Sequence, residues 1–353
     1  MRGKMTNGAE ILVEALVRSG VDTVFGFPGD TSIGFYDVLA RRADEIRHVL
    51  ARDERHAGFM ADAYTRSTSR LGVCEAPSGA GAVYLASGLA EAFAASVPLL
   101  AITTDNNRRS HGTAPISEVD QEQLFTACTK WRRTAESAEE IPALLAEAVA
   151  AALGGRPGPV VLILPEDVLE EVPEVVPATA PVRAAAPGTR ADAPSAALDE
   201  AAAALRAAER PVAVAGGGAH LSGAGPALLA LAERLAMPVG TSIHGKGVVD
   251  EAHPLALGVV GGNGARDYAN EHVAGGDLVL FVGTRANATD TLGFTTPRRD
   301  GPRILHVETD PSRAGRNYPG GIPLVGDART VLESLLARVP AVPEAERAAR
   351  LAP

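Results

Sequence analysis

Short apolar runs alternate with amphipathic segments along most of the 353-residue chain. Five runs in the first half predict buried strands, at residues 22–27, 46–50, 71–75, 97–102 and 158–165. Segments with apolar residues at helical spacing lie between them, at 9–18, 54–66, 80–92, 118–127 and 140–153. Apolar strands that alternate with helices are typical of a parallel sheet covered on both faces.

A second α/β pattern follows, with strands predicted at 211–215, 237–241, 277–283 and 303–308 and helices at 225–235 and 328–337. Between the two patterns lies a stretch rich in Pro, Ala and Val without a period, which is typical of an extended linker. We therefore predict the α/β fold class, with two doubly wound domains that each have a mainly parallel sheet flanked by helices. The predicted division is an N-terminal domain at 1–170, a linker at 171–196, a Rossmann-like domain at 197–340 and a tail at 341–353.

Composition narrows the class of partner. The net charge is -10 and no basic run occurs, which argues against a nucleic acid bound through its phosphates. No apolar stretch is long enough for a membrane span, and the basic N-terminus lacks the apolar core of a secretory signal. Cys74 and Cys128 have no Cys or His at metal-ligand spacing, so we predict no metal site on this chain. We expect a cytoplasmic protein.

Three loops with candidate chemistry follow predicted strands in the first domain. They are Pro28-Gly29, the segment around Glu54, and Ser78-Gly79-Ala80-Gly81. Ligands bind in open α/β sheets at the carboxyl edge of the strands, and glycines let a ligand approach the backbone. Two plainer interpretations stay open at this point. Glu54 fits an ordinary first-turn acid that complements the helix dipole, and the glycine-rich segment fits an ordinary turn.

Several other chemistries find no support. A phosphate-binding P-loop is excluded because the Gly-Lys-Ser/Thr ending is absent. The turn Gly216-Gly217-Gly218 follows a strand, but Leu221 stands where the dinucleotide fingerprint has its third glycine. The histidines are scattered, and neither a hydrolytic triad nor a metal site is indicated.

Many segments occur together in the order found in one enzyme family. They are 24–29, Glu54 with 60–66, 78–81, 87–92 and 96–103, then 210–211, 216–218, 245–247, 253–255 and 325–328. On these segments the chain resembles the acetolactate synthase-like family of thiamine-diphosphate enzymes, from about residue 8 to residue 340. The resemblance implies a pyrimidine-binding N-terminal domain followed by a central domain.

The resemblance also implies roles for single residues. Glu54 matches the glutamate that hydrogen-bonds the aminopyrimidine ring of thiamine diphosphate and activates it, so it is the expected catalytic residue. The other expected cofactor-binding residues are Pro28, Gly29, Ser78, Gly79, Gly81 and Tyr84. The implied activity is decarboxylation of a 2-oxo acid such as pyruvate and transfer of the acyl unit to an acceptor. The alternative is a non-catalytic structural or regulatory subunit of such an enzyme.

In the family a C-terminal domain carries Gly-Asp-Gly and Asn-Asn, which hold Mg²⁺ and the diphosphate. No Gly-Asp-Gly occurs in this sequence. We therefore expect a split enzyme, in which a separate subunit supplies the Mg²⁺ ligands and the chains form a homodimer or a heterotetramer.

The chain departs from the family's pattern at several positions near the expected cofactor and substrate. Ala80 replaces a proline, Tyr84 replaces an asparagine, and Ile116-Ser117 replace the Phe-Gln pair of acetolactate synthases, with Glu118 retained. His111 stands alone where the decarboxylase branch has paired histidines. His111, Ile116 and Ser117 are therefore the candidate substrate residues.

Two further points stay open in the sequence. Arg55-His56 fit either recognition of an acidic substrate or polar surface. Acetolactate synthases bind FAD on the central domain, but Ala286-Asn287 replace the acidic pair that usually follows the arginine there, so FAD is left open.

Overall fold

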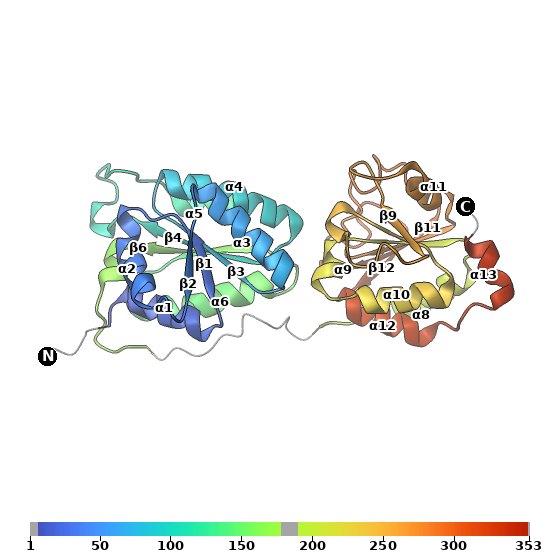
Figure 1. Ribbon diagram of the computed structural model, residues 1–353, viewed down its shortest axis with the longest axis horizontal. Coiled ribbons are helices and arrows are strands. Elements are labelled where there is room, and N and C mark those ends of the chain that lie inside the picture. Colours follow the sequence, from blue (N-terminus) through green and yellow to red (C-terminus); the bar gives the residue numbers. More distant parts are fainter. Residues whose placement is uncertain (1–5, 178–189, 352–353) are drawn as a thin grey trace. The chain divides into compact units, whose positions relative to one another are not determined.

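The computed structural model describes residues 6–177 and 190–351. The chain divides into two compact units, residues 1–188 and 189–353, each around its own sheet (Figure 1). All pairings between the named strands are parallel, which confirms the predicted α/β class. Among the described residues no helix is long and apolar enough to cross a membrane.

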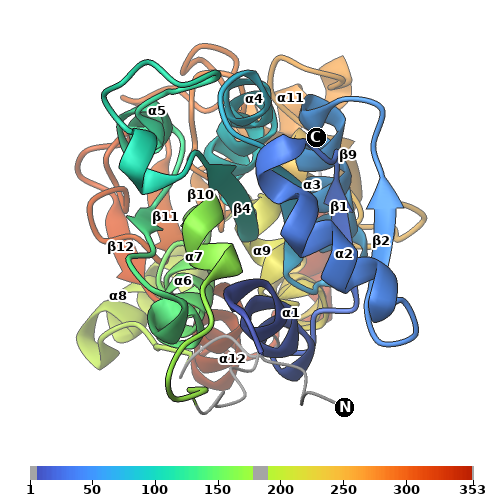
Figure 2. The ribbon, with the colours of Figure 1, turned by 90° about the vertical axis from the view of Figure 1, so that its left-hand side faces the viewer.

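The N-terminal unit has a six-stranded sheet in the order β2-β1-β3-β4-β6-β5. Its strands are β1 (Thr23–Gly26), β2 (Arg47–Leu50), β3 (Gly72–Ala76), β4 (Leu99–Asp105), β5 (Trp131–Thr134) and β6 (Pro159–Pro165). Helices α1 (Gly8–Arg18), α2 (Ile33–Arg41) and α6 (Ile141–Leu153) cover one face, and α3 (Glu54–Thr68) and α4 (Ala80–Ala95) cover the other (Figures 1 and 2). The short helices α5 (Gln121–Leu124) and α7 (Glu166–Glu170) complete the unit.

The structure corrects three details of this unit. The strand expected to be buried at 46–50 is the edge strand β2, and Leu50 at its end is 59% exposed. The helix expected at 118–127 is limited to α5 and the 3-10 turn Phe125–Ala127. Strand β5 was not predicted, because its sequence Trp-Arg-Arg-Thr has no apolar run; it forms the opposite edge of the sheet, where polar side chains reach solvent.

The second unit has a six-stranded sheet in the order β12-β11-β10-β7-β8-β9. Its strands are β7 (Pro211–Ala215), β8 (Val239–Thr241), β9 (Ala256–Val259), β10 (Leu278–Val282), β11 (Arg303–Glu308) and β12 (Ile322–Val325). Helices α8 (Ser195–Ala207), α10 (Gly225–Leu235) and α12 (Ala328–Arg338) pack in one core cluster, and α11 (Asp267–Gly275) packs in another. The remaining helix before α10 is the short α9 (Gly217–Leu221).

The segment set apart in the sequence as a tail contains a helix, α13 (Glu344–Leu351). Arg350 on this helix is buried and donates to the backbone carbonyls of Leu235 and Arg206, at 3.3 and 3.2 Å. The Pro- and Ala-rich composition of the segment did not predict this helix, because the residues that Arg350 contacts lie more than 100 positions away in the sequence.

Two glycines determine how closely α3 and α4 pack. A Cβ atom added to Gly88 would lie 2.8 Å from the Cα atom of Gly58, and one added to Gly58 would lie 3.1 Å from the Cα atom of Gly88. Both contacts are with backbone, which cannot move aside as a flexible side chain can. The two helices therefore lie in direct backbone contact, and their N-termini follow strands β2 and β3 at the same sheet edge.

We predict that Gly88→Ala separates the two helices and lowers the free energy of unfolding by about 1–3 kcal/mol, as overpacking does. Urea denaturation followed by the fluorescence of Trp131, the only tryptophan, measures this. The matched control is Gly34→Ala in α2, where an added Cβ meets no atom within 4 Å. That control is expected to be neutral or mildly stabilising, since alanine favours a helix over glycine. Equal effects at the two positions would contradict the packing argument.

Candidate functional site

The loops after β1 and β3 meet around Pro77. A Cβ atom added to Gly29 would lie 2.5 Å from the Cβ atom of Pro77, and one added to Gly81 would lie 2.8 Å from the Cδ atom of Pro77. Only glycine fits at either position without displacing the proline ring. The sheet edge thus brings together the Pro28-Gly29 and Ser78–Gly81 segments that the sequence predicts as neighbours.

Glu54 is the first residue of α3, and its neighbour Asp53 is the N-cap. The Asp53 carboxylate accepts a hydrogen bond from the Arg55 N–H at 2.9 Å, so Asp53 supplies the capping interaction. Glu54 is half-buried, and its Oε1 atom would lie 3.0 Å from a Cβ at Gly81. The carboxylate therefore lies across the start of α4, where it can meet a ligand that rests on the glycine turn.

The start of α4 has the backbone of a ligand-binding turn. Gly79 is the N-cap at φ +64°, a conformation that favours glycine, and no side chain in the described part of the chain caps this helix. The Ser78 N–H donates to the Thr31 hydroxyl at 3.1 Å, and the hydroxyls of Thr31 and Thr104 are 2.8 Å apart. These bonds fix the turn to the loop after β1 and to the end of β4.

The candidate substrate residues fall in two places. Ser117 packs against Gly79, where an added Cβ would collide with it, and the neighbouring Ile116 is 86% exposed. His111 lies elsewhere, with its Nε2 atom 3.2 Å from the Asn106 carbonyl oxygen and 3.6 Å from Asp105. The structure therefore brings Ser117 to the glycine turn and does not bring His111 there.

Tyr84 and Arg55 interact on the outer side of the helix pair. Tyr84 on α4 is 47% exposed, and the Arg55 guanidinium lies 5.4 Å from the centre of its ring. Arg55 also forms an ion pair with Asp53 at 2.6 Å, and this guanidinium lowers the pKa of Asp53 to about 2. The charge of Arg55 is therefore already paired within the chain.

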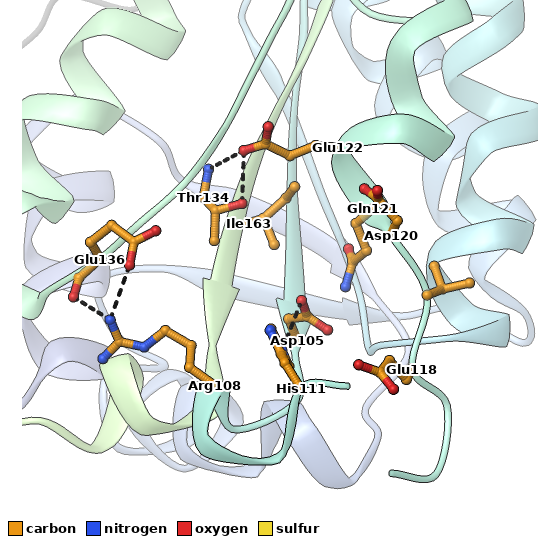
Figure 3. A pocket seen from close by; sticks show the side chains of 11 residues that line it. Asp105, Arg108, His111, Glu118, Asp120, Gln121, Glu122, Thr134, Glu136 and Ile163 are labelled. Atoms are coloured by element: carbon orange, nitrogen blue, oxygen red, sulfur yellow. Dashed lines mark hydrogen bonds and ion pairs between the residues drawn. The ribbon is translucent and has the colours of Figure 1, made fainter. Parts of the chain in front are cut away.

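A cavity of roughly 530 Å³ lies beyond the ends of β4, β5 and β6 (Figure 3). Its charged lining is mainly acidic: Asp105, Glu118, Asp120, Glu122 and Glu136, with Arg108 and His111. Most of these carboxylates have partners, since Glu122 accepts from Thr134, Arg108 pairs with Glu136 at 3.3 Å, and Glu118 accepts from the Gly112 N–H at 2.6 Å. Burial raises the pKa of Asp105, which lies nearest to His111.

Sequence reasoning missed one residue of this edge, Glu75. It lies near the end of β3, pairs in register with Gly26, and is 0% exposed. The Tyr36 hydroxyl donates to its Oε2 atom, and its Oε1 atom has no hydrogen-bond partner among the described residues. Burial raises the pKa of Glu75 to about 8, and the charge of Glu54 adds to this increase. The available signal was one carboxyl group inside the apolar strand sequence Gly-Val-Cys-Glu-Ala.

The second unit contains a glycine turn that lies close to a second loop. The Gly218 N–H donates to the Gly283 carbonyl at 2.9 Å, and a Cβ at Gly216 would lie 2.5 Å from the Cβ atom of Thr284. The Gly216–Gly218 turn therefore touches the segment that begins at Gly283, and FAD binding, which the sequence leaves open, is not tested by this contact. Across the described ranges, no group of three or more His, Cys, Asp or Glu side chains could hold a metal ion.

A parallel sheet with glycine turns and a carboxylate at its carboxyl edge defines a ligand-binding α/β unit. Comparison with protein families specifies the class. Residues 6–124 match the thiamine pyrophosphate enzyme N-terminal TPP binding domain, and residues 198–335 match the thiamine pyrophosphate enzyme central domain. The chain belongs to the thiamine pyrophosphate enzyme family and contains these two domains.

Individual relatives agree with this assignment. The chain is 36% identical over 341 residues to an acetolactate synthase of Arthrospira platensis, covering 95% of this chain and 58% of that protein. It is 40% identical over 356 residues to the Pseudomonas aeruginosa protein named "Probable 2-ketoarginine decarboxylase AruI", covering 99% of this chain and 62% of the relative. A crystal structure from Mycobacterium smegmatis, described as that of "a putative thiamin diphosphate-dependent enzyme", superposes with a TM-score of 0.81 at 25% identity, covering 97% of this chain and 64% of that one. The chain thus spans about three fifths of the length of these relatives.

We predict that Glu75 makes the stability of the N-terminal unit depend on pH. Its pKa is about 8 in the folded chain, against an ordinary value of 4.5, so between these values the folded state holds a proton that the unfolded state has released. Stability is therefore lost as the pH rises through this window, by a few kcal/mol at about 1.4 kcal/mol per pKa unit.

Urea denaturation of the wild type and Glu75→Gln at pH 5, 7 and 8.5 checks this. The free energy of unfolding of the wild type is expected to fall relative to that of the variant as the pH increases. The exposed Glu139→Gln serves as the control and is expected to follow the wild type. A constant difference between wild type and Glu75→Gln would mean that Glu75 is ionised throughout.

Proposed function

We propose that this chain forms the pyrimidine side of a thiamine diphosphate site in an enzyme that decarboxylates a 2-oxo acid and transfers the acyl unit to an acceptor. When bound, thiamine diphosphate supplies the electron sink that such a decarboxylation needs. The observation that carries the proposal is the position of the Glu54 carboxylate across the Gly81 turn, in a chain with the family's N-terminal domain.

The residues present fit this cofactor. Any side chain at Gly81 would fill the space beside Glu54 Oε1, so the glycine leaves room for a flat ring against the carboxylate. Glu54 would accept a hydrogen bond from the ring and exchange a proton with it, as a positioned general acid–base does. The ring would rest on a surface formed by Pro28, Gly29, Ser78, Gly79 and Gly81. Tyr84 would lie at the border of this surface, where the Arg55 guanidinium contacts its side chain.

The other half of the site belongs, in this proposal, to another polypeptide chain. That chain would hold the diphosphate and Mg²⁺, and the simplest symmetric assembly would be a heterotetramer with two copies of each chain. Exposed apolar side chains at the carboxyl edge support such an interface: Phe27, Ile33, Leu50 and Ile116 are 37–86% exposed. The name "acetolactate synthase large subunit", which several relatives carry, also supports an enzyme of more than one chain.

A 2-oxo acid is the substrate class that the comparisons support, because 2-ketoarginine in the name of one relative is itself a 2-oxo acid. Ser117 and Ile116 would reach this substrate, since Ser117 touches the glycine turn and Ile116 projects into solvent beside it. His111 would act only indirectly, because it lies with Asp105 in the acidic cavity.

We predict that Glu54→Gln lowers cofactor-dependent CO₂ release at least about 100-fold, since a positioned acid–base group contributes on the order of 10²–10⁴ in rate. The measurement uses the complex isolated through a tag on this chain, supplied with thiamine diphosphate, Mg²⁺ and a 2-oxo acid. Size-exclusion chromatography shows whether the complex is intact. Glu139→Gln is the matched control and is expected to keep the wild-type rate.

Two results would contradict parts of the proposal. Unchanged turnover in an intact Glu54→Gln complex would support the non-catalytic subunit instead. Full turnover by this chain without any other polypeptide would contradict the division of the site between chains.

A further inference from the structure

We propose that Glu75 is a second carboxyl group of this site: a buried positioning residue, held by the Tyr36 hydroxyl beside Gly26, that acts on Glu54 through its charge. The inference rests on the proposed role of Glu54. Family resemblance gives no role to Glu75, and its position inside a strand gives no reason for a carboxyl group there.

The surroundings of Glu75 accommodate a carboxyl group. Its neighbour in β1 is Gly26, where an added Cβ would lie 3.0 Å from Glu75 Oε2 and would collide with the Tyr36 hydroxyl. Glycine at this position leaves space for both polar groups between β1 and α2. Tyr36 then donates its hydroxyl hydrogen to Oε2. The pair therefore occupies a specific, fully buried space rather than a chance gap in the core.

Among the described residues, no cation affects the proton equilibrium of Glu75. The groups that act on its proton equilibrium are the hydroxyls of Tyr36 from α2 and Ser32 from the preceding turn, and the carboxylate of Glu54 from α3. His48 on β2 lies behind Tyr36 with ring centres 4.8 Å apart, and burial lowers the pKa of this histidine. Cys74 is the residue before Glu75 in β3. Its thiol is also buried, and burial raises the pKa of that thiol.

A buried carboxylate needs a cation or several hydrogen bonds. In the described part of the chain, Glu75 has one hydrogen-bond donor, Tyr36, and its Oε1 atom has no partner. The neutral acid is the form that these surroundings accept, since a neutral carboxyl group costs far less to bury than an anion.

Glu54 and Glu75 are therefore two carboxyl groups in opposite environments. Glu54 is half-buried at a helix N-terminus, which favours its charge, whereas Glu75 is enclosed. The charge of Glu54 raises the pKa of Glu75, so the two carboxyl groups interact electrostatically. Pairs whose environments separate their protonation in this way are typical of acid–base sites.

Carbon-13 NMR of the full chain with labelled glutamate tests the coupling without any cofactor. In the wild type we expect a buried glutamate carboxyl signal with a titration midpoint near pH 8. The signal is assigned by its absence in Glu75→Gln. Glu54→Gln is expected to lower the midpoint by about half a pH unit, because a neighbouring negative charge is removed. Tyr36→Phe is expected to raise it, because a donor to the ionised form is lost.

The coupling is overturned if the midpoint is the same in Glu54→Gln as in the wild type, or if Glu75 titrates in the ordinary range below pH 6. Glu139→Gln controls for changes in net charge and should leave the midpoint in place. Should Glu75→Gln fail to fold, the shift of the signal in Tyr36→Phe assigns it instead.

The functional part is tested by the pH profile of turnover in the assembled enzyme. Wild-type turnover should change at alkaline pH with the midpoint measured for Glu75, and this inflection should disappear in Glu75→Gln. A purely structural glutamate would alter stability and leave the shape of the profile as in the wild type, which overturns the proposal. Failure of the proposed function itself is separate: turnover would then be insensitive to Glu54→Gln, whatever NMR shows for Glu75.

Discussion

The backbone contact between α3 and α4 is the constraint on which the site depends. Gly58 and Gly88 let the helices touch, and each helix starts at the carboxyl end of a strand of the same sheet. Their N-termini are therefore held together, so that Glu54 on one lies against Gly81 on the other. Pro77 completes this arrangement by filling the space that the glycines at 29 and 81 leave. A carboxylate beside bare backbone follows from helix packing rather than from a flexible loop.

Burial then gives the two glutamates at this edge different properties. Asp53 supplies the capping interaction of α3, so Glu54 is free to face a ligand at a helix N-terminus that favours negative charge. Glu75 is enclosed behind Gly26 with Tyr36 as its donor, and burial favours its neutral form. Two carboxylates in similar surroundings compete for one proton, and the different surroundings of Glu54 and Glu75 avoid this competition in the proposed site.

Periodicity was enough to predict the inner strands of both sheets, because they are near-continuous apolar runs. It failed for β5, β9 and β12, which are edge strands where polar or turn residues are tolerated. The site itself was predictable only through the resemblance. Local pattern made Glu54 an ordinary first-turn acid, and its contact with Gly81 depends on packing between distant segments. Glu75 was missed because an isolated polar residue in an apolar run carries no period, and the Tyr36 hydroxyl that accounts for it lies 39 positions away.

The most direct test of the account is a crystal structure of the assembled enzyme with thiamine diphosphate bound. We predict the aminopyrimidine ring against the Gly79–Gly81 turn, with a ring nitrogen within hydrogen-bond distance of the Glu54 carboxylate and the diphosphate on another polypeptide chain. A cofactor bound away from Glu54, or one held entirely by other chains, would contradict the claim that this chain forms the pyrimidine side of the site.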